Sequence, residues 1–135
     1  MDMEIAFPGG KKVDAQFKGF YHKTDQPTEE GGDGTAPEPF DLFLVSIGTC
    51  AGIYALSFCQ ARHIDSKDLK MALQFHKNAK TRLIEKIEIH MTLPAGFPKE
   101  YVKAIVRSTR LCSVKKQMDH PPVFDITADI GGIEA

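Results

Sequence analysis

Residues 41–62 read Asp-Leu-Phe-Leu-Val-Ser-Ile-Gly-Thr-Cys-Ala-Gly-Ile-Tyr-Ala-Leu-Ser-Phe-Cys-Gln-Ala-Arg, and this stretch predicts a long helix. Pro39 lies just before it, where the first turn of a helix tolerates proline. The apolar side chains occur nearly all round the helical wheel, and a helix without a polar face is a buried helix. A chain of 135 residues has difficulty covering such a helix on every side. The stretch therefore favours a partner subunit, and the alternative is a monomer in which a sheet and one other helix suffice.

Alternating apolar and polar residues flank this helix. A period of two is the mark of strands with one wet face. The alternation predicts strands at 1–7, 13–22, 69–76, 86–93 and 124–130. Asn78-Ala79-Lys80 lies between two of these stretches and predicts the turn of a hairpin.

A second helix is predicted to begin at Pro98 and to run to about Leu111. Cys112 then lies at its end, or at the start of a further helical piece through Met118. The segment 24–39 is rich in Pro, Gly, Asp, Glu and Thr and is expected to be a loop. The order β-β-α-β-β-α-β predicts a single α+β domain over 1–135, with an antiparallel sheet whose dry face carries the helices.

Bulk composition excludes several classes of function. The chain is 42% hydrophobic and 26% charged with a net charge of -1, which gives no electrostatic case for nucleic acid or an anionic membrane. No apolar run is expected to approach the roughly 20 residues that span a bilayer. The acidic N-terminus Met-Asp-Met-Glu-Ile does not read as a signal peptide. We therefore expect a cytoplasmic protein.

Helical phase separates two of the three cysteines. Cys50 and Cys59 are nine residues apart, which places them half a turn out of phase on opposite faces of the helix. Cys59 is most simply a small core residue. The alternative is a metal pair of Cys59 and His63, but a site needs three or four ligands, so we expect no metal.

Two motifs carry a resemblance that covers nearly the whole chain. The segment 34–50 reads Gly-Thr-Ala-Pro-Glu-Pro-Phe-Asp-Leu-Phe-Leu-Val-Ser-Ile-Gly-Thr-Cys, and Cys112-Ser113-Val114 follows late in the chain. A Pro-rich loop, an acidic residue, a helix of small and apolar residues that reaches a Cys, and a second Cys before Ser-Val resemble the OsmC/Ohr family of osmotically inducible and organic hydroperoxide resistance proteins. The likeness is closest to the short branch of about 135 residues.

The resemblance implies a fold and a chemistry. The family fold is an intertwined homodimer, in which antiparallel sheets wrap around two central helices that carry the cysteines. Cys50 would be the peroxidatic thiolate and Cys112 the resolving thiol of a redox protein that reduces organic hydroperoxides. A dithiol would be the reductant, and no cofactor is implied.

The chain departs from the peroxidase pattern beside the first cysteine. The peroxidases use an Arg from the N-terminal strands, held by a Glu about ten residues before that cysteine. Here no Arg precedes Arg62, and Phe40 stands at the Glu position. Asp41 and Glu38 are the nearest carboxylates. Three lysines are candidates for the cation, although Lys cannot form the same bidentate pair: Lys12, Lys18 and Lys23.

Other residues are candidates to support Cys50. Tyr54 and Ser57 share its face of the helix and are candidate hydrogen-bond donors, with ordinary helix packing as the alternative. His120, after the Cys112 segment, is a weaker candidate.

The departure leaves two other functions open. One is a non-enzymatic or small-ligand-binding dimer that lacks peroxidase activity. The other is a hydrolase with Cys50 as acyl nucleophile, for which no His/Asp partner stands at a recognisable spacing.

Overall fold

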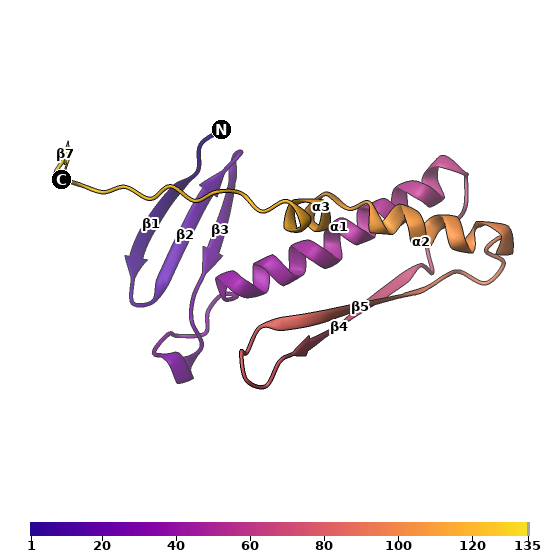
Figure 1. Cartoon of the computed structure of the whole chain (residues 1–135), viewed down its shortest axis with the longest axis horizontal. Helices are drawn as coiled ribbons and strands as arrows, with labels where there is room; N and C mark the ends of the chain where they lie inside the picture. The colour runs from indigo at the N-terminus through magenta and orange to yellow at the C-terminus, as the bar shows by residue number, and fades with distance from the viewer. Residues whose placement is uncertain (135) are drawn as a thin grey trace.

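Helix α1 (Pro39–Ala61) is the longest element of the computed structural model, which describes residues 1–134 (Figure 1). It begins at Pro39, close to the predicted start. One face is buried within the chain, through Ile47, Ala51, Ala55, Phe58 and Cys59. Gly48 faces the hairpin, where a Cβ atom would lie 3.4 Å from Cδ1 of Leu73.

The opposite side of α1 is uncovered within the chain. Val45 is 56% exposed and Ile53 is 49% exposed. The helix is also long and apolar enough to cross a membrane, judged by length and composition alone. The expectation that no apolar run approaches that length was therefore wrong; the core helix of a soluble protein has the same length and composition.

The N-terminal strands form an antiparallel sheet of their own in the order β1-β2-β3. Its strands are β1 (Glu4–Gly9), β2 (Lys12–Phe17) and β3 (Phe20–Thr24). Residues 20–22 do not extend the second strand as expected, because Lys18 and Gly19 adopt positive φ angles of 51° and 81° and turn the chain back. Every residue of β1 is exposed.

The loop between β3 and α1 is held by a buried carboxylate. Asp25 accepts hydrogen bonds from the backbone N–H of Gln26 (2.8 Å) and from both the N–H and the hydroxyl of Thr35 (3.1 and 2.7 Å). Lys12 forms ion pairs with Asp25, at 3.8 Å, and with Asp33. The hydroxyl of Thr35, its N–H, the N–H of Gln26 and the charge of Lys12 together lower the pKa of Asp25 to about 2, against the opposing effect of burial.

Strands β4 (Lys70–Lys77) and β5 (Ile84–Thr92) form the predicted hairpin. The Asn78 side chain accepts from the N–H groups of Lys80 (2.9 Å) and Thr81 (3.0 Å), which fixes the turn. This hairpin lies along α1 and does not join the N-terminal sheet (Figure 1). The α+β class with antiparallel strands is confirmed, but the expected single sheet is not: within the described residues of one chain the strands form three separate sheets.

The helical part of the C-terminal half also agrees with prediction. A 3-10 turn, η2 (Lys99–Tyr101), leads into α2 (Val102–Arg110), and α3 (Ser113–Asp119) is the further helical piece. Ile105 of α2 is fully buried and forms the core with Ala55, Phe58 and Cys59 of α1. Tyr101, Val102 and Val106 are only partly covered, because each is at least 37% exposed.

The expected final strand at 124–130 was wrong. Only the end of that range pairs, as the two-residue strands β6 (Asp129–Ile130) and β7 (Ile133–Glu134). Residues 121–128 run as an open chain past α1 toward the N-terminal sheet (Figure 1). Phe124 and Ile126 are 82% and 89% exposed. The alternating pattern is present, but among residues 1–134 no strand pairs with the 121–128 segment.

Candidate functional site

Two of the three thiols lie side by side. Cys50 lies midway along α1 and is partly exposed, and Cys112 is 3% exposed at the N-cap of α3. The two side chains are neighbours, since Cys50 is among the groups that raise the pKa of Cys112. The fold thus places the middle of α1 next to the start of α3, with one free cysteine on each side.

The environment of Cys112 favours its protonated form. Burial is the largest effect and raises the pKa of the Cys112 thiol, and the neighbouring Cys50 raises it further. The N–H of Lys115 donates to Cys112 Sγ at 3.3 Å and acts in the opposite direction. At neutral pH Cys112 is therefore a thiol with one backbone donor already placed at its sulfur.

Tyr54, one turn after Cys50, bonds to a different residue from the one expected. Its hydroxyl lies 3.2 Å from Oγ of Ser113, the residue directly after Cys112. Neither Tyr54 nor Ser57 forms a hydrogen bond with Cys50 in the part of the chain that the structure describes. Ser113 was missed as a partner because only the fold brings a residue 59 positions away to Tyr54.

The two candidate carboxylates lie at the start of α1. Asp41 is nine residues before Cys50, which is about 13 Å along a helix, and Glu38 is the N-cap residue. Among residues 1–134, neither side chain forms a hydrogen bond or an ion pair. The structure of one chain does not bring either carboxylate to the thiols.

Two of the three candidate lysines have other partners. Lys12 is paired with Asp25 and Asp33 in the loop before α1. Lys18 Nζ lies 5.4 Å from the centre of the Phe17 ring. Lys23 lies exposed on β3. The ion pairs of Lys12 disfavour it as the cation that activates Cys50.

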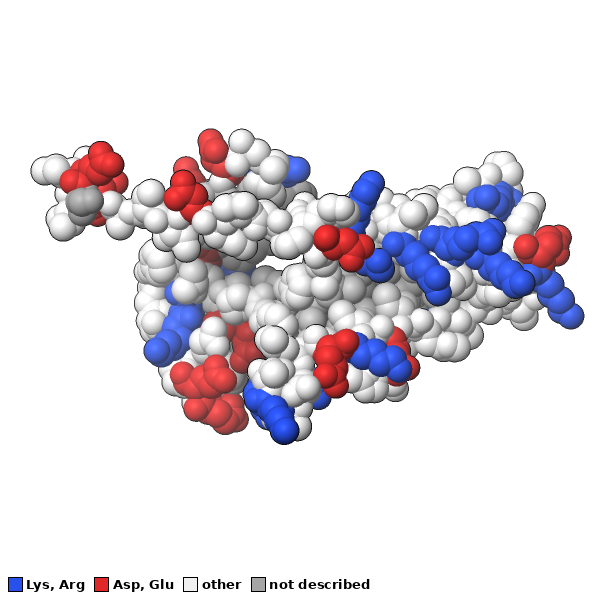
Figure 2. All heavy atoms as spheres, in the orientation of Figure 1, with Lys and Arg blue, Asp and Glu red and all other residues white. Residues whose placement is uncertain are grey.

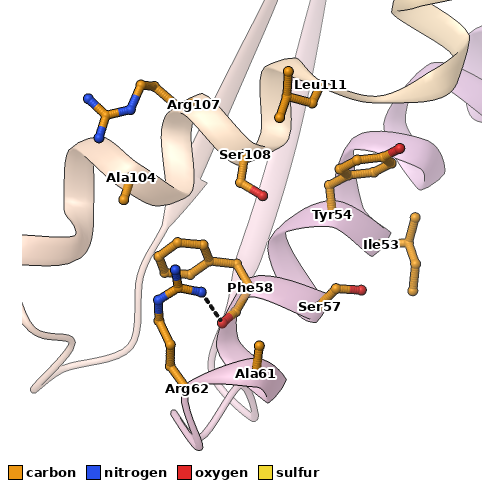
Figure 3. Close-up of a pocket in the computed structure, with 10 residues that line it drawn as sticks. All are labelled: Ile53, Tyr54, Ser57, Phe58, Ala61, Arg62, Ala104, Arg107, Ser108 and Leu111. Carbon is orange, nitrogen blue, oxygen red and sulfur yellow. Dashed lines mark hydrogen bonds between the residues drawn. The ribbon is translucent and has the colours of Figure 1, made fainter.

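An apolar cleft of about 520 Å³ runs between α1 and α2 (Figure 3). Tyr54 and Ser57 line it from α1, and Ser108 and Leu111 line it from α2 and its end. Figure 3 shows Arg62 reaching up beside the Phe58 ring. Its guanidinium carbon lies 3.6 Å from the ring centre, and Nη1 donates to the Phe58 carbonyl at 3.3 Å.

A second cavity, of about 630 Å³, reaches Cys112 from the hairpin side. Ile89 and Met91 of β5 form part of its wall. Arg110, Lys115 and Asp119 also line it, and Lys115 is paired with Asp119 at 3.2 Å. Basic side chains also gather over α2, as Figure 2 shows for the region where Figure 1 places that helix. The cavity beside Cys112 thus combines an apolar wall with the cation of Arg110 and the Lys115–Asp119 ion pair.

The remaining candidates lie elsewhere. Cys59 is fully buried in the core, as predicted for a small core residue, and burial raises the pKa of its thiol. In the described residues 1–134, no group of three or more His, Cys, Asp or Glu side chains is placed to hold a metal. His120 ends α3, and its Nδ1 lies 3.2 Å from the Lys116 carbonyl oxygen.

Comparison with known proteins gives a family match. The model of the family described as OsmC-like protein matches residues 32–127. No curated protein matches the chain. The matched range includes α1, the hairpin and both Cys50 and Cys112.

Solved structures show the same fold at low sequence identity. An OsmC like protein from Mycoplasma pneumoniae has a TM-score of 0.68 at 14% identity, covering 87% of this chain and 86% of that one. A hypothetical protein from Aquifex aeolicus has a TM-score of 0.66 at 21% identity, over 88% and 86%. An organic hydroperoxide resistance protein from Legionella pneumophila has a TM-score of 0.58 at 17% identity, over 87% of each chain.

Proposed function

Because this chain belongs to the OsmC-like protein family, we propose that it is a thiol-based redox protein that reduces organic hydroperoxides through Cys50 and Cys112. The observation that supports the proposal is the placement of Cys50 next to Cys112: the hydroxyl of Tyr54, one turn after Cys50, lies 3.2 Å from Oγ of Ser113, which directly follows Cys112, and Cys50 is among the groups that raise the pKa of Cys112. The description of the Legionella protein as an organic hydroperoxide resistance protein supports the choice of oxidant.

The proposed cycle has three steps. The Cys50 thiolate attacks the terminal oxygen of the hydroperoxide, the O–O bond breaks, an alcohol leaves, and Cys50 becomes a sulfenic acid. The Cys112 sulfur then attacks the Cys50 sulfur, which forms a disulfide and releases water. An external dithiol reduces the disulfide by exchange and is itself oxidised to a disulfide.

Two features of the site suit these roles. Cys50 is the more exposed thiol of the pair, so it is the one that a hydroperoxide reaches first. Cys112 is buried with a raised pKa, so it stays protonated until the sulfenic acid forms beside it.

Thiol counting tests the proposal. We expect one equivalent of cumene hydroperoxide to consume two of the three free thiols, with Cys59 left unreacted. Peptide mapping will identify the Cys50–Cys112 disulfide. Cys50→Ser removes the reaction, and Cys59→Ser is the matched control that retains it. Survival of all three thiols in the wild-type protein contradicts the proposal.

A second candidate function is a small-ligand-binding dimer without peroxidase activity. The observation that favours it is the pairing of Lys12 with Asp25 and Asp33, which removes one of the three candidate replacements for the arginine. A Cys50→Ser protein that matches the wild type in every redox assay supports this candidate.

We also propose that the protein acts as a homodimer. Val45 and Ile53 are about half exposed on α1, and Phe124 and Ile126 are almost fully exposed in the C-terminal segment. Exposed apolar surface of this extent marks an interface. A second copy that covers α1 and pairs with the C-terminal segment accounts for both. Sedimentation equilibrium tests this: a mass of one chain at micromolar concentration contradicts it.

We place the protein in the cytoplasm. A thiol pair that must be re-reduced after each turnover suits a reducing compartment. Fractionation of cells that produce the protein tests the placement.

A further inference from the structure

The hydroxyl groups of Tyr54 and Ser113 join α1 to α3 beside the thiol pair. They lie 3.2 Å apart. Tyr54 is four residues after Cys50, one helical turn along α1, and Ser113 is bonded directly to Cys112. The hydrogen bond thus links the residue one helical turn after Cys50 to the residue that directly follows Cys112.

Cys112 itself is buried, but the segments on either side of it are not. The residue stands between α2 and α3 with extended backbone angles, φ -56° and ψ 139°, so neither helix continues through it. Helix α3 has seven residues, none of them buried. Leu111, on the other side of Cys112, is 67% exposed. In the described part of the chain, Tyr54–Ser113 is the one side-chain hydrogen bond between α1 and α3.

We propose that Tyr54 and Ser113 are positioning residues, which hold Cys112 beside Cys50 and so promote closure of the disulfide. The inference rests on the proposed function. In the step concerned, the Cys112 sulfur attacks the sulfur of the Cys50 sulfenic acid, the S–O bond breaks, the S–S bond forms, and water leaves. A thiol held close to its target has a higher effective concentration than one on a free segment.

The structure also gives Tyr54 a different role from that of a donor to Cys50. Figure 3 shows Tyr54 on α1 with Leu111 across the cleft, and Leu111 directly precedes Cys112 in the sequence. A donor to Cys50 affects the reaction of that thiol with hydroperoxide. The hydrogen bond between Tyr54 and Ser113, called the clasp below, affects only the second step and the stability of the disulfide.

Two measurements separate these steps. The first is the rate of disulfide formation after a pulse of cumene hydroperoxide, followed by quenching and thiol alkylation. The second is the equilibrium of the Cys50–Cys112 disulfide in a glutathione buffer, which needs no hydroperoxide. We expect Tyr54→Phe and Ser113→Ala each to lower both by about fivefold, the factor that corresponds to one neutral hydrogen bond.

Matched variants control for general damage. Ser113→Thr keeps the hydroxyl and restores both values to within twofold of the wild type. Tyr101→Phe removes a hydroxyl for which residues 1–134 offer no hydrogen bond, and it leaves both values unchanged. The double variant Tyr54→Phe/Ser113→Ala is no worse than either single variant, because both remove the same bond. In a Cys112→Ser background, Tyr54→Phe leaves the reaction of Cys50 with hydroperoxide unchanged.

The possible outcomes distinguish failure of the clasp from failure of the proposed function. If the wild type forms the disulfide and both single variants match it within twofold, the clasp is wrong and the proposed function stands. If Tyr54→Phe slows the first step instead, Tyr54 acts on Cys50 and the clasp is again wrong. If the wild type forms no disulfide with hydroperoxide or with oxidised glutathione, both proposals are overturned.

Discussion

Cys112 lies beside Cys50, 62 positions earlier in the chain, and burial together with this neighbour raises the pKa of its thiol. A reactive cysteine has a lowered thiol pKa, so the raised pKa of Cys112 disfavours its thiolate. This effect suits a thiol that acts second, because a protonated Cys112 does not compete with Cys50 for the oxidant. The raised pKa of Cys112 therefore agrees with the proposed role of this thiol in the second step.

The rate of disulfide closure will rise with pH. The attacking species is the Cys112 thiolate, and below its raised pKa the thiolate fraction grows about tenfold for each pH unit. We expect the second step to accelerate on this slope between pH 7 and 8.5, measured by rapid quenching and alkylation. A flat profile over this range contradicts the role of Cys112 as the buried, protonated partner.

Cys112→Ser will stop the cycle after its first step. Without the second thiol, the Cys50 sulfenic acid has no partner and persists. We expect dimedone to add one label to Cys50 in this variant after hydroperoxide treatment, measured by mass spectrometry of peptides. Cys59→Ser is the control and gives no such label, because its Cys112 still closes the disulfide. Label on Cys59 instead of Cys50 contradicts the assignment.

Asp25 will contribute stability that depends on pH. Its pKa is lowered on folding to about 2, so the folded protein binds fewer protons there than the unfolded chain. The contribution is complete above the ordinary pKa of about 3.9 and is lost as pH falls through about 2. We expect Asp25→Asn to lower the urea midpoint at pH 6, and the difference from wild type to shrink between pH 4 and 2. Asp125→Asn is the exposed control, and an equal loss in both variants contradicts the prediction.

Ile105→Ala will destabilise the core. Ile105 is fully buried against Ala55, Phe58 and Cys59, so truncation leaves a cavity that costs about 2–5 kcal/mol. Val106→Ala, at a site that is 37% exposed, is the control and is expected to cost less than about 1 kcal/mol. Urea unfolding at fixed protein concentration measures both, and equal costs contradict the packing described here.

Ile53→Asp will weaken the proposed dimer. Ile53 is 49% exposed on the uncovered side of α1, and a carboxylate buried there against a second copy loses its hydration without a partner. We expect the dissociation constant from sedimentation to rise at least about 100-fold. Leu83→Asp, in the exposed hairpin turn, is the control. Equal dimer affinity in both variants shows that this side of α1 is not the interface.

The long helix and the hairpin could be predicted from the sequence because both are local patterns. The apolar run that begins near Pro39 and the alternation around Asn78 depend on neighbours a few residues away. The family resemblance was predicted in the same way, from two motifs, and the match over residues 32–127 confirms it. Strand pairing is not local, so the separate N-terminal sheet and the unpaired 121–128 segment did not follow from alternation alone.

In the candidate site, too, local features could be predicted from the sequence and long-range contacts could not. Helical phase separated Cys59 from Cys50 because both lie on one helix. The role of Ser113 as a partner of Tyr54 could not be predicted, because only the packing of α1 against α3 brings the two residues together. The commitment of Lys12 likewise depends on a loop conformation, held by Asp25 and by Gly32, where a Cβ atom would lie 1.9 Å from the Gln26 carbonyl oxygen.

The open segment at 121–128 has a consequence for how the protein reaches its final state. Its alternating apolar side chains and free backbone groups form a template for β-pairing. On the dimer proposed here, the last step of folding is a collision between two chains, so its rate depends on their concentration. A newly made chain at low concentration spends longer with this template exposed, and aggregation competes with assembly during that time.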